Sequence, residues 1–167
     1  MIDLRRVGRQ IVRAVLAVAA WAMAAGLAGA QEAVTISVPP AVSFMVTDVV
    51  QATSGSPSPA TVSFSNATLD DGKALRISVQ ADASSFTPPA GAAIPAANVS
   101  WSVLGAAGGV GSGGTLSATS FGLVYQSNPN TVSGHVDLAW TLAAPGSGIR
   151  AGRHHLTIRW KVESITP

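Results

Sequence analysis

The stretch TVSGHVDLAWTLAAPGSGIRAGRHHLTIRWKVE, residues 131–163, contains two runs in which apolar and polar residues alternate strictly. In the first run, one face carries Val132, Gly134, Val136, Leu138, Trp140 and Leu142. In the second run, one face carries Leu156, Ile158, Trp160 and Val162. A period of two residues is that of a β-strand with one buried and one solvated face. The stretch therefore predicts two strands that turn their tryptophans toward a core.

The two runs are expected to pair with each other as one long antiparallel hairpin, because only a glycine- and proline-containing connection, residues 143–152, separates them. One register keeps the apolar residues opposite one another and sets Trp140 against Leu156, Leu138 against Ile158, and Val136 against Trp160. The same register places Asp137 opposite Arg159. A slip of one residue would turn the whole apolar set toward water, so the pattern favours a well-defined register.

Shorter alternating runs occupy much of the chain before this stretch, at residues 34–38, 42–46, 61–65, 73–81, 99–103 and 121–125. Three segments rich in Gly, Pro, Ser or Ala are predicted to be connections, the third of them flexible: residues 48–60, 84–97 and 105–114. About eight or nine short strands without an amphipathic helix predict an all-β fold. We expect an immunoglobulin-like or jelly-roll-like antiparallel β-sandwich. Its core should centre on Trp101, Trp140 and Trp160.

The N-terminal thirty residues have the pattern of an export signal. A basic start with Arg5, Arg6, Arg9 and Arg13 precedes an apolar run that ends in Ala28-Gly29-Ala30. This pattern predicts a helical signal peptide, residues 1–30, cleaved between Ala30 and Gln31, and a single β-sandwich domain, residues 31–167. The alternative is that the apolar run is retained as a membrane anchor. The Arg5-Arg6 pair also raises twin-arginine export, which the following Val7-Gly8-Arg9 matches poorly.

Charge and cysteine content narrow the class of protein. Four of the ten basic residues and one of the eight acidic residues lie in the predicted leader, so the remaining chain carries six bases and seven acids. The basic character of the whole chain is therefore no argument for nucleic-acid binding. The chain has no cysteine, which excludes disulfides, a cysteine-linked lipid anchor and thiolate chemistry.

Two sequence patterns resemble ligand sites. His154 and His155 are adjacent, but consecutive strand residues point to opposite faces, so the pair is not expected to chelate one metal ion. Residues 109–114, GVGSGG, match the GxGxxG spacing of dinucleotide sites. The run after them is strand-like, whereas a dinucleotide site needs a helix N-terminus there. We therefore expect no metal site and no cofactor.

The sequence contains few motifs that are typical of catalytic residues. The sequence has no GxSxG elbow and no recognisable Ser-His-Asp signature. Among the carboxylates, Asp70 and Asp71 precede Gly72 in a predicted turn, and Asp137 is expected beside Arg159. Asn66 and Asn98 begin N-x-S/T sequons, a pattern that often arises by chance. No catalytic residue is predicted.

The segment VDLAWTLAAP, residues 136–145, resembles the closing segment of bacterial WxL surface domains. The resemblance implies an exported all-β protein that attaches non-covalently to the cell wall. The WxL family usually carries a second Trp-x-Leu motif, whereas the earlier candidate here reads Trp101-Ser102-Val103. The glycine-containing turn Ala151-Gly152-Arg153 before the final strand is similar to that of fimbrial and spore-coat-type subunits.

These observations favour a non-enzymatic structural or adhesive module of the bacterial cell surface or cell wall. Its expected location is periplasmic, cell-surface or extracellular, and it should contact the membrane only through the leader before cleavage. Exposed strand edges or loops would contact a cell-wall polymer or another surface protein. The alternative is a carbohydrate- or peptidoglycan-binding domain, for which Tyr125, Phe86 and Phe121 are the candidate stacking residues. An enzyme of unknown type is a third alternative that no motif favours.

Overall fold

The computed structural model describes residues 2–3 and 32–167. The predicted signal helix and the predicted cleavage point between Ala30 and Gln31 lie outside these residues. The described chain is almost entirely β-structure, as predicted, with one short 3-10 helix, η1 (Ala96–Asn98). No helix in these two ranges has the length and hydrophobicity needed to cross a membrane.

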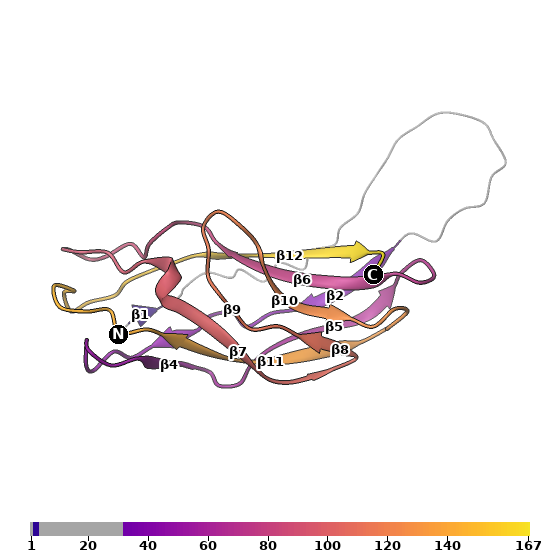
Figure 1. Cartoon of the computed structure of the whole chain (residues 1–167), viewed down its shortest axis with the longest axis horizontal. Helices are drawn as coiled ribbons and strands as arrows, with labels where there is room; N and C mark the ends of the chain where they lie inside the picture. Colours follow the sequence, from indigo (N-terminus) through magenta and orange to yellow (C-terminus); the bar gives the residue numbers. More distant parts are fainter. Residues whose placement is uncertain (1, 4–31) are drawn as a thin grey trace, which may run out of the picture.

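The strands form two antiparallel sheets (Figure 1). The larger sheet contains β1 (Ile2–Asp3), β2 (Ala33–Ser37), β3 (Ser43–Phe44), β4 (Thr53–Ser56), β5 (Ala60–Thr68), β7 (Val99–Ala107), β9 (Gly114–Thr115) and β11 (Gly134–Leu142). The smaller sheet has the order β12 (Ile158–Ile165), β6 (Ala74–Ala81), β10 (Gly122–Ser127) and β8 (Gly109–Gly111).

Strand β11 is the centre of the larger sheet. Along one edge it pairs first with β5 and then with β4, and along the other edge it pairs with β7. Pro57 and Pro59 lie between β4 and β5, where the missing proline N–H groups interrupt the ladder. Pro39 and Pro40 separate β2 from β3, which pair with β5 and β4 respectively. The segment 48–60, predicted to be a loop, therefore contributes strand β4 to the sheet.

The predicted C-terminal hairpin is wrong. Strand β12 belongs to the smaller sheet and pairs with β6, where Trp160 lies opposite Val79. Trp140 of β11 lies opposite Trp101 of β7 instead of Leu156. The connection, residues 143–157, crosses between the sheets instead of closing a hairpin. The alternating pattern was sufficient to identify both strands, but it contains no information about which strand lies beside each one.

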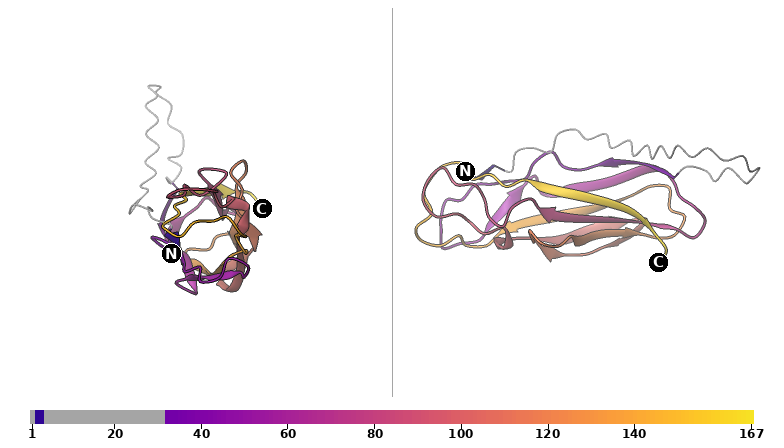
Figure 2. Two further views of the ribbon diagram at one scale, coloured as in Figure 1. Left: turned by 90° about the vertical axis from the view of Figure 1, so that its left-hand side faces the viewer. Right: turned by 90° about the horizontal axis from the view of Figure 1, so that it is seen from above.

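The two sheets pack face to face around one apolar core (Figure 2). Phe64 of β5 and Tyr125 of β10 meet across the interior with ring centroids 5.8 Å apart. Trp101 and Trp140 are buried, and their ring centroids lie 5.5 Å apart. The prediction that these two side chains lie in the core is therefore confirmed. Trp160 packs against the core but is only half-buried, because β12 is an edge strand.

The glycine-rich tract, residues 105–114, is not the flexible connection that its composition predicted. It completes β7 and forms β8 and the start of β9. A Cβ added at Gly111 would lie 2.8 Å from methyl carbons of Val103 and Val136, and one added at Gly114 would lie 2.6 Å from the Trp101 ring. These glycines are required because neighbouring side chains occupy the space that a larger residue would need.

Two long connections pack together at one end of the molecule. Backbone bridges join Thr87 to His155 and Gly91 to Ile149. Phe86 donates its N–H to the carbonyl oxygen of Ile94 at 2.8 Å, and both side chains are buried. The proline-rich segment 84–97 is therefore an ordered extension of the core, although it contains no strand of its own.

Candidate functional site

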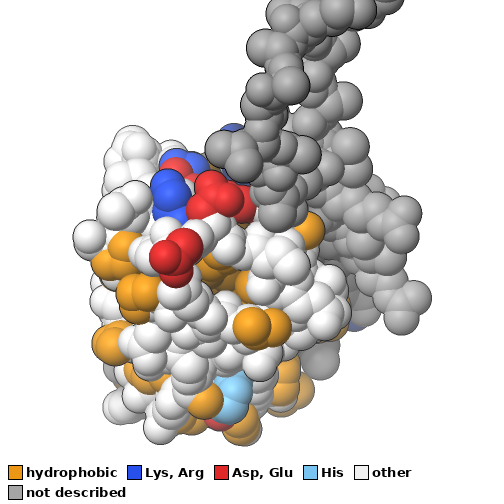
Figure 3. Space-filling view, turned by 90° about the vertical axis from the view of Figure 1, so that its right-hand side faces the viewer, with side chains coloured by type: hydrophobic (Ala, Val, Ile, Leu, Met, Phe, Trp, Pro, Cys, Tyr) orange, Lys and Arg blue, Asp and Glu red, His pale blue; other side chains and the backbone are white. Residues whose placement is uncertain are grey.

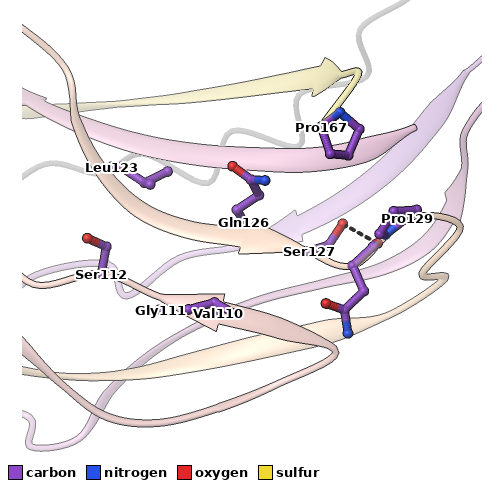
Figure 4. Close-up of a pocket in the computed structure, with 9 residues that line it drawn as sticks. Val110, Gly111, Ser112, Leu123, Gln126, Ser127, Pro129 and Pro167 are labelled. Carbon is purple, nitrogen blue, oxygen red and sulfur yellow. Dashed lines mark hydrogen bonds between the residues drawn. The ribbon is translucent and has the colours of Figure 1, made fainter. Parts of the chain in front are cut away.

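A pocket of about 400 Å³ lies on the outer side of the smaller sheet, between β8, β10 and the residues after β12 (Figure 4). Its lining consists of Val110, Gly111, Ser112, Leu123, Gln126, Ser127, Asn128, Pro129 and Pro167. Leu123 and Gln126 lie opposite Ser78 and Arg76 of β6, whose side chains alternate with the core residues Ile77 and Val79. This register turns both side chains of β10 away from the core and into the pocket.

The pocket combines apolar walls with neutral polar groups. Val110 is 69% exposed and Leu123 is 37% exposed, so apolar surface is available at the rim. Gln126 and Asn128 contribute side-chain amides. The buried hydroxyl of Ser127 is already engaged: it accepts the Leu75 N–H at 2.8 Å and donates to the carbonyl oxygen of Asn128 at 2.9 Å. None of the nine lining residues has a titratable side chain that could act as a general acid or base.

Compensated charges occupy the same side of the smaller sheet. Arg159 of β12 pairs with Asp82, which follows β6. Lys161 lies 2.7 Å from Glu163 and 5.6 Å from the centroid of the Phe121 ring. At the end of the molecule that faces the viewer in Figure 3, positive and negative side chains are grouped together, while hydrophobic side chains are dispersed over the visible surface. Arg159 and Lys161 each have a nearby acid, and Arg76 of β6 lies opposite Glu163 on the same face.

The outer face of the larger sheet is covered mainly by small polar side chains. Cross-strand neighbours there include Ser63 and His135, Thr61 and Asp137, and Ser54 and Thr141. Thr61 Oγ1 donates to Asp137 Oδ1 at 2.5 Å, and His135 Nε2 lies 4.0 Å from Asp137 Oδ2. The predicted proximity of Asp137 to Arg159 is therefore wrong, since these residues belong to different sheets.

The contacts of Thr61, Asp137 and His135 do not form a catalytic triad. In a triad the imidazole lies between the nucleophilic hydroxyl and the carboxylate, where it can take the hydroxyl proton. Here the carboxylate of Asp137 lies between the hydroxyl and the imidazole. The arrangement can hold β5 against β11, but it places no imidazole beside the Thr61 hydroxyl.

The histidines do not converge. His154 is buried, with Nε2 3.0 Å from the carbonyl oxygen of Arg150, whereas His155 is exposed, as expected for consecutive residues of an extended segment. His135 lies on β11 in the other sheet. Within residues 2–3 and 32–167, no three side chains of His, Asp or Glu are grouped closely enough to hold a metal ion.

The carboxylates near the predicted turn have structural roles. Gly72 donates its N–H to Asn130 Oδ1 at 2.8 Å, and the Asn130 amide donates to Asp71 Oδ1 at 2.9 Å. The Asp70 N–H is bonded to Glu32 Oε1 at 3.0 Å. These bonds fasten the turn to the start of β2 and to the loop before β11, which agrees with the turn predicted at Asp70-Asp71-Gly72.

Two of the three predicted sugar-stacking aromatics are inside the protein. Tyr125 and Phe86 are buried, and only Phe121 is exposed, at 40%. The Tyr125 hydroxyl donates to the carbonyl oxygen of Ala107 at 2.8 Å, and burial raises the pKa of this phenol. Tyr125 and Phe86 therefore cannot contribute to an open stacking platform, and Phe121 is the one exposed ring of the three.

The pocket itself was not predicted from the sequence. Its residues come from β8, from β10 and the loop after it, and from Pro167, so no single run of sequence contains the site. The one local signal was Val110, an apolar residue inside a tract of glycines. No protein-family model, curated protein or solved structure matches this chain. The likeness to WxL and fimbrial-type proteins therefore stays a prediction.

Proposed function

We propose that the protein is an exported, non-enzymatic structural or adhesive module of the bacterial cell surface or cell wall. The pocket on the smaller sheet is the observation that carries this proposal. Its rim offers Val110 and Leu123 for apolar contact, and its amides offer hydrogen bonds to a neutral polar partner. A cell-wall polymer or another surface protein provides such groups, and a surface of this kind favours adhesion over chemistry.

Several features support the same class of protein. The two face-to-face sheets suit a β-sandwich of the immunoglobulin-like or jelly-roll-like kind, a common architecture of surface domains. The basic, then apolar, then small-residue order of residues 1–30 favours export and cleavage after Ala30. Residues 136–142 of the WxL-like segment form most of β11, the central strand of the larger sheet. A wall-associated location follows from that resemblance.

Cell fractionation and co-sedimentation test this function. The full chain would be expressed with its own leader in a bacterial host, and the exported form would be mixed with isolated cell walls. Val110→Asp places a charge at the pocket rim and should reduce retention about tenfold, because desolvating a carboxylate at an apolar contact is costly. Val50→Asp is a matched control, since Val50 is 67% exposed and lies outside the pocket lining.

Three results would contradict the proposal. One is recovery of the unprocessed chain only from the cytoplasm. Another is an absence of retention on cell walls and on the envelope fraction for the unmodified protein. The third is equal loss of retention for Val110→Asp and Val50→Asp, which would remove the pocket from the contact surface.

A further inference from the structure

Strand β12 is the long and regular edge strand of the smaller sheet, as the described residues form it. It lies at the end of the smaller sheet, and among the described strands it pairs with β6 alone. All eight of its residues have a partner in β6, and the register has no shift along its length. A flat edge of this length presents a row of backbone N–H and C=O groups that another strand can pair with.

The other edges of the described sheets are short or irregular. Strand β2 has a register shift between Ala33 and Thr35 and is followed by Pro39 and Pro40. Strands β8 and β9 contain three and two residues. Bulges, prolines, short lengths and charged side chains are the features that discourage edge pairing. Strand β12 is regular over eight residues and has no proline within Ile158–Ile165, although Pro167 follows it. Its charged side chains, Arg159, Lys161 and Glu163, limit the registers that a second strand can adopt.

The side chains of β12 also leave apolar surface incompletely covered. Ile158, Trp160 and Val162 face the core but are only partly buried. Trp160 Nε1 is shielded from solvent and has no hydrogen-bond acceptor among the described residues. An additional strand along β12 would extend the smaller sheet and cover the open side of these residues.

We propose that β12 pairs antiparallel with β12 of a second copy of this chain, with the two-fold axis at Val162. In this register Lys161 lies opposite Glu163 of the partner subunit, and the contact is repeated by symmetry. Within one chain Lys161 and Glu163 are already 2.7 Å apart, so the two copies form an alternating ladder of four charges. A register centred on Lys161 would instead place two like charges directly opposite each other, which is unfavourable.

Self-association of this kind goes beyond the proposed function and does not depend on export or on the pocket. A contact limited to two edge strands is small, so the dissociation constant should be on the order of 10–100 μM. It can be measured by sedimentation equilibrium on the full chain without any cell-wall material. A failure here would therefore leave the co-sedimentation result with cell walls unaffected.

Charge complementation tests the register. Lys161→Glu makes two carboxylates face each other across the dimer, and Glu163→Lys makes two ammonium groups face each other. Each variant alone should dimerise at least about tenfold more weakly than the unmodified protein. An equimolar mixture of the two variants should restore dimerisation, because every cross-strand pair then has opposite charges. Asp48→Lys, in an exposed loop, is the control for Glu163→Lys, because both substitutions raise the net charge by about two units.

A cysteine cross-link provides a second test that does not depend on charge. The chain has no cysteine, and two copies of Val162→Cys would meet at the two-fold axis within the Cα separation that a disulfide requires. Arg159→Cys should not cross-link, because this register places position 159 opposite Ile165 of the partner subunit. Circular dichroism would verify that each variant is folded. A monomeric unmodified protein at millimolar concentration would overturn the proposal, as would a folded mixture that fails to dimerise or equal cross-linking at both positions.

Discussion

Strands β11 and β12 have the same alternating pattern in sequence but very different places in the molecule. Strand β11 has neighbours along both edges, and Trp140 within it is 2% exposed. Strand β12 has β6 on one edge, and Trp160 within it is only partly buried. The comparison teaches that alternation identifies the face of a strand that is buried, while the depth of burial depends on how many neighbours the strand has.

The largest expected difference between the two strands is in the cost of removing their tryptophans. Trp140→Ala should lower the free energy of unfolding by about 3–5 kcal/mol, because a fully enclosed indole leaves a cavity behind. Trp160→Ala should cost roughly half as much, because its site is partly open to solvent. Urea unfolding followed by circular dichroism measures both changes. An equal or larger loss for Trp160→Ala would show that β12 is as deeply enclosed as β11.

A smaller loss of stability is expected when the glycine that begins β11, Gly134, is replaced. A Cβ at Gly134 would lie 2.5 Å from the Tyr125 hydroxyl and 2.7 Å from the carbonyl oxygen of Ala107. Gly134→Ala should therefore destabilise the protein by about 1–3 kcal/mol through overpacking. The same unfolding measurement on Gly105→Ala is the control, since a Cβ there would be 3.9 Å from its nearest neighbour, Asp137. We expect a change of about 0.5 kcal/mol or less for that control, and similar losses at both glycines would refute the packing explanation.

Structural features that depend on residues close together in the chain could be predicted from the sequence. Strand β6 has its predicted core face, and Leu75, Ile77 and Val79 are all buried. The turn at residues 70–72 also follows from local chemistry, because Gly72 adopts a positive φ of 75°. In each of these cases the residues that determine the conformation are close together in the chain.

Features that depend on distant contacts could not be predicted in the same way. The glycines of residues 105–114 suggested flexibility, but Gly109, Gly111 and Gly114 must be small because atoms of β7, β10 and β11 lie beside them. The candidate pocket is assembled from β8, β10 and Pro167, which become neighbours only after the smaller sheet has formed. Strand pairing belongs to the same class of information, since β12 could satisfy its alternating pattern beside any strand with a matching face.

The smallest expected effect distinguishes the observed pairing of β12 from the hairpin that the sequence predicted. In the structure Arg159 pairs with Asp82, and both side chains are largely exposed. A double-mutant cycle with Arg159→Gln and Asp82→Asn should give a coupling energy of about 0.2–1 kcal/mol, which is typical of an exposed ion pair. Raising the salt concentration should reduce that coupling, because exposed charges are screened.

The matched cycle replaces Asp82→Asn with Asp137→Asn. Asp137 is on β11 in the larger sheet, where its carboxylate accepts a hydrogen bond from Thr61, so the single change should be destabilising for a reason unrelated to Arg159. The coupling energy between positions 137 and 159 should then be zero within about 0.3–0.5 kcal/mol, as for residues that share no contacts. A hairpin of β11 with β12 requires the opposite result, with coupling at 137 and none at 82. Because both cycles use the same arginine substitution, any general effect of losing that charge cancels in the comparison.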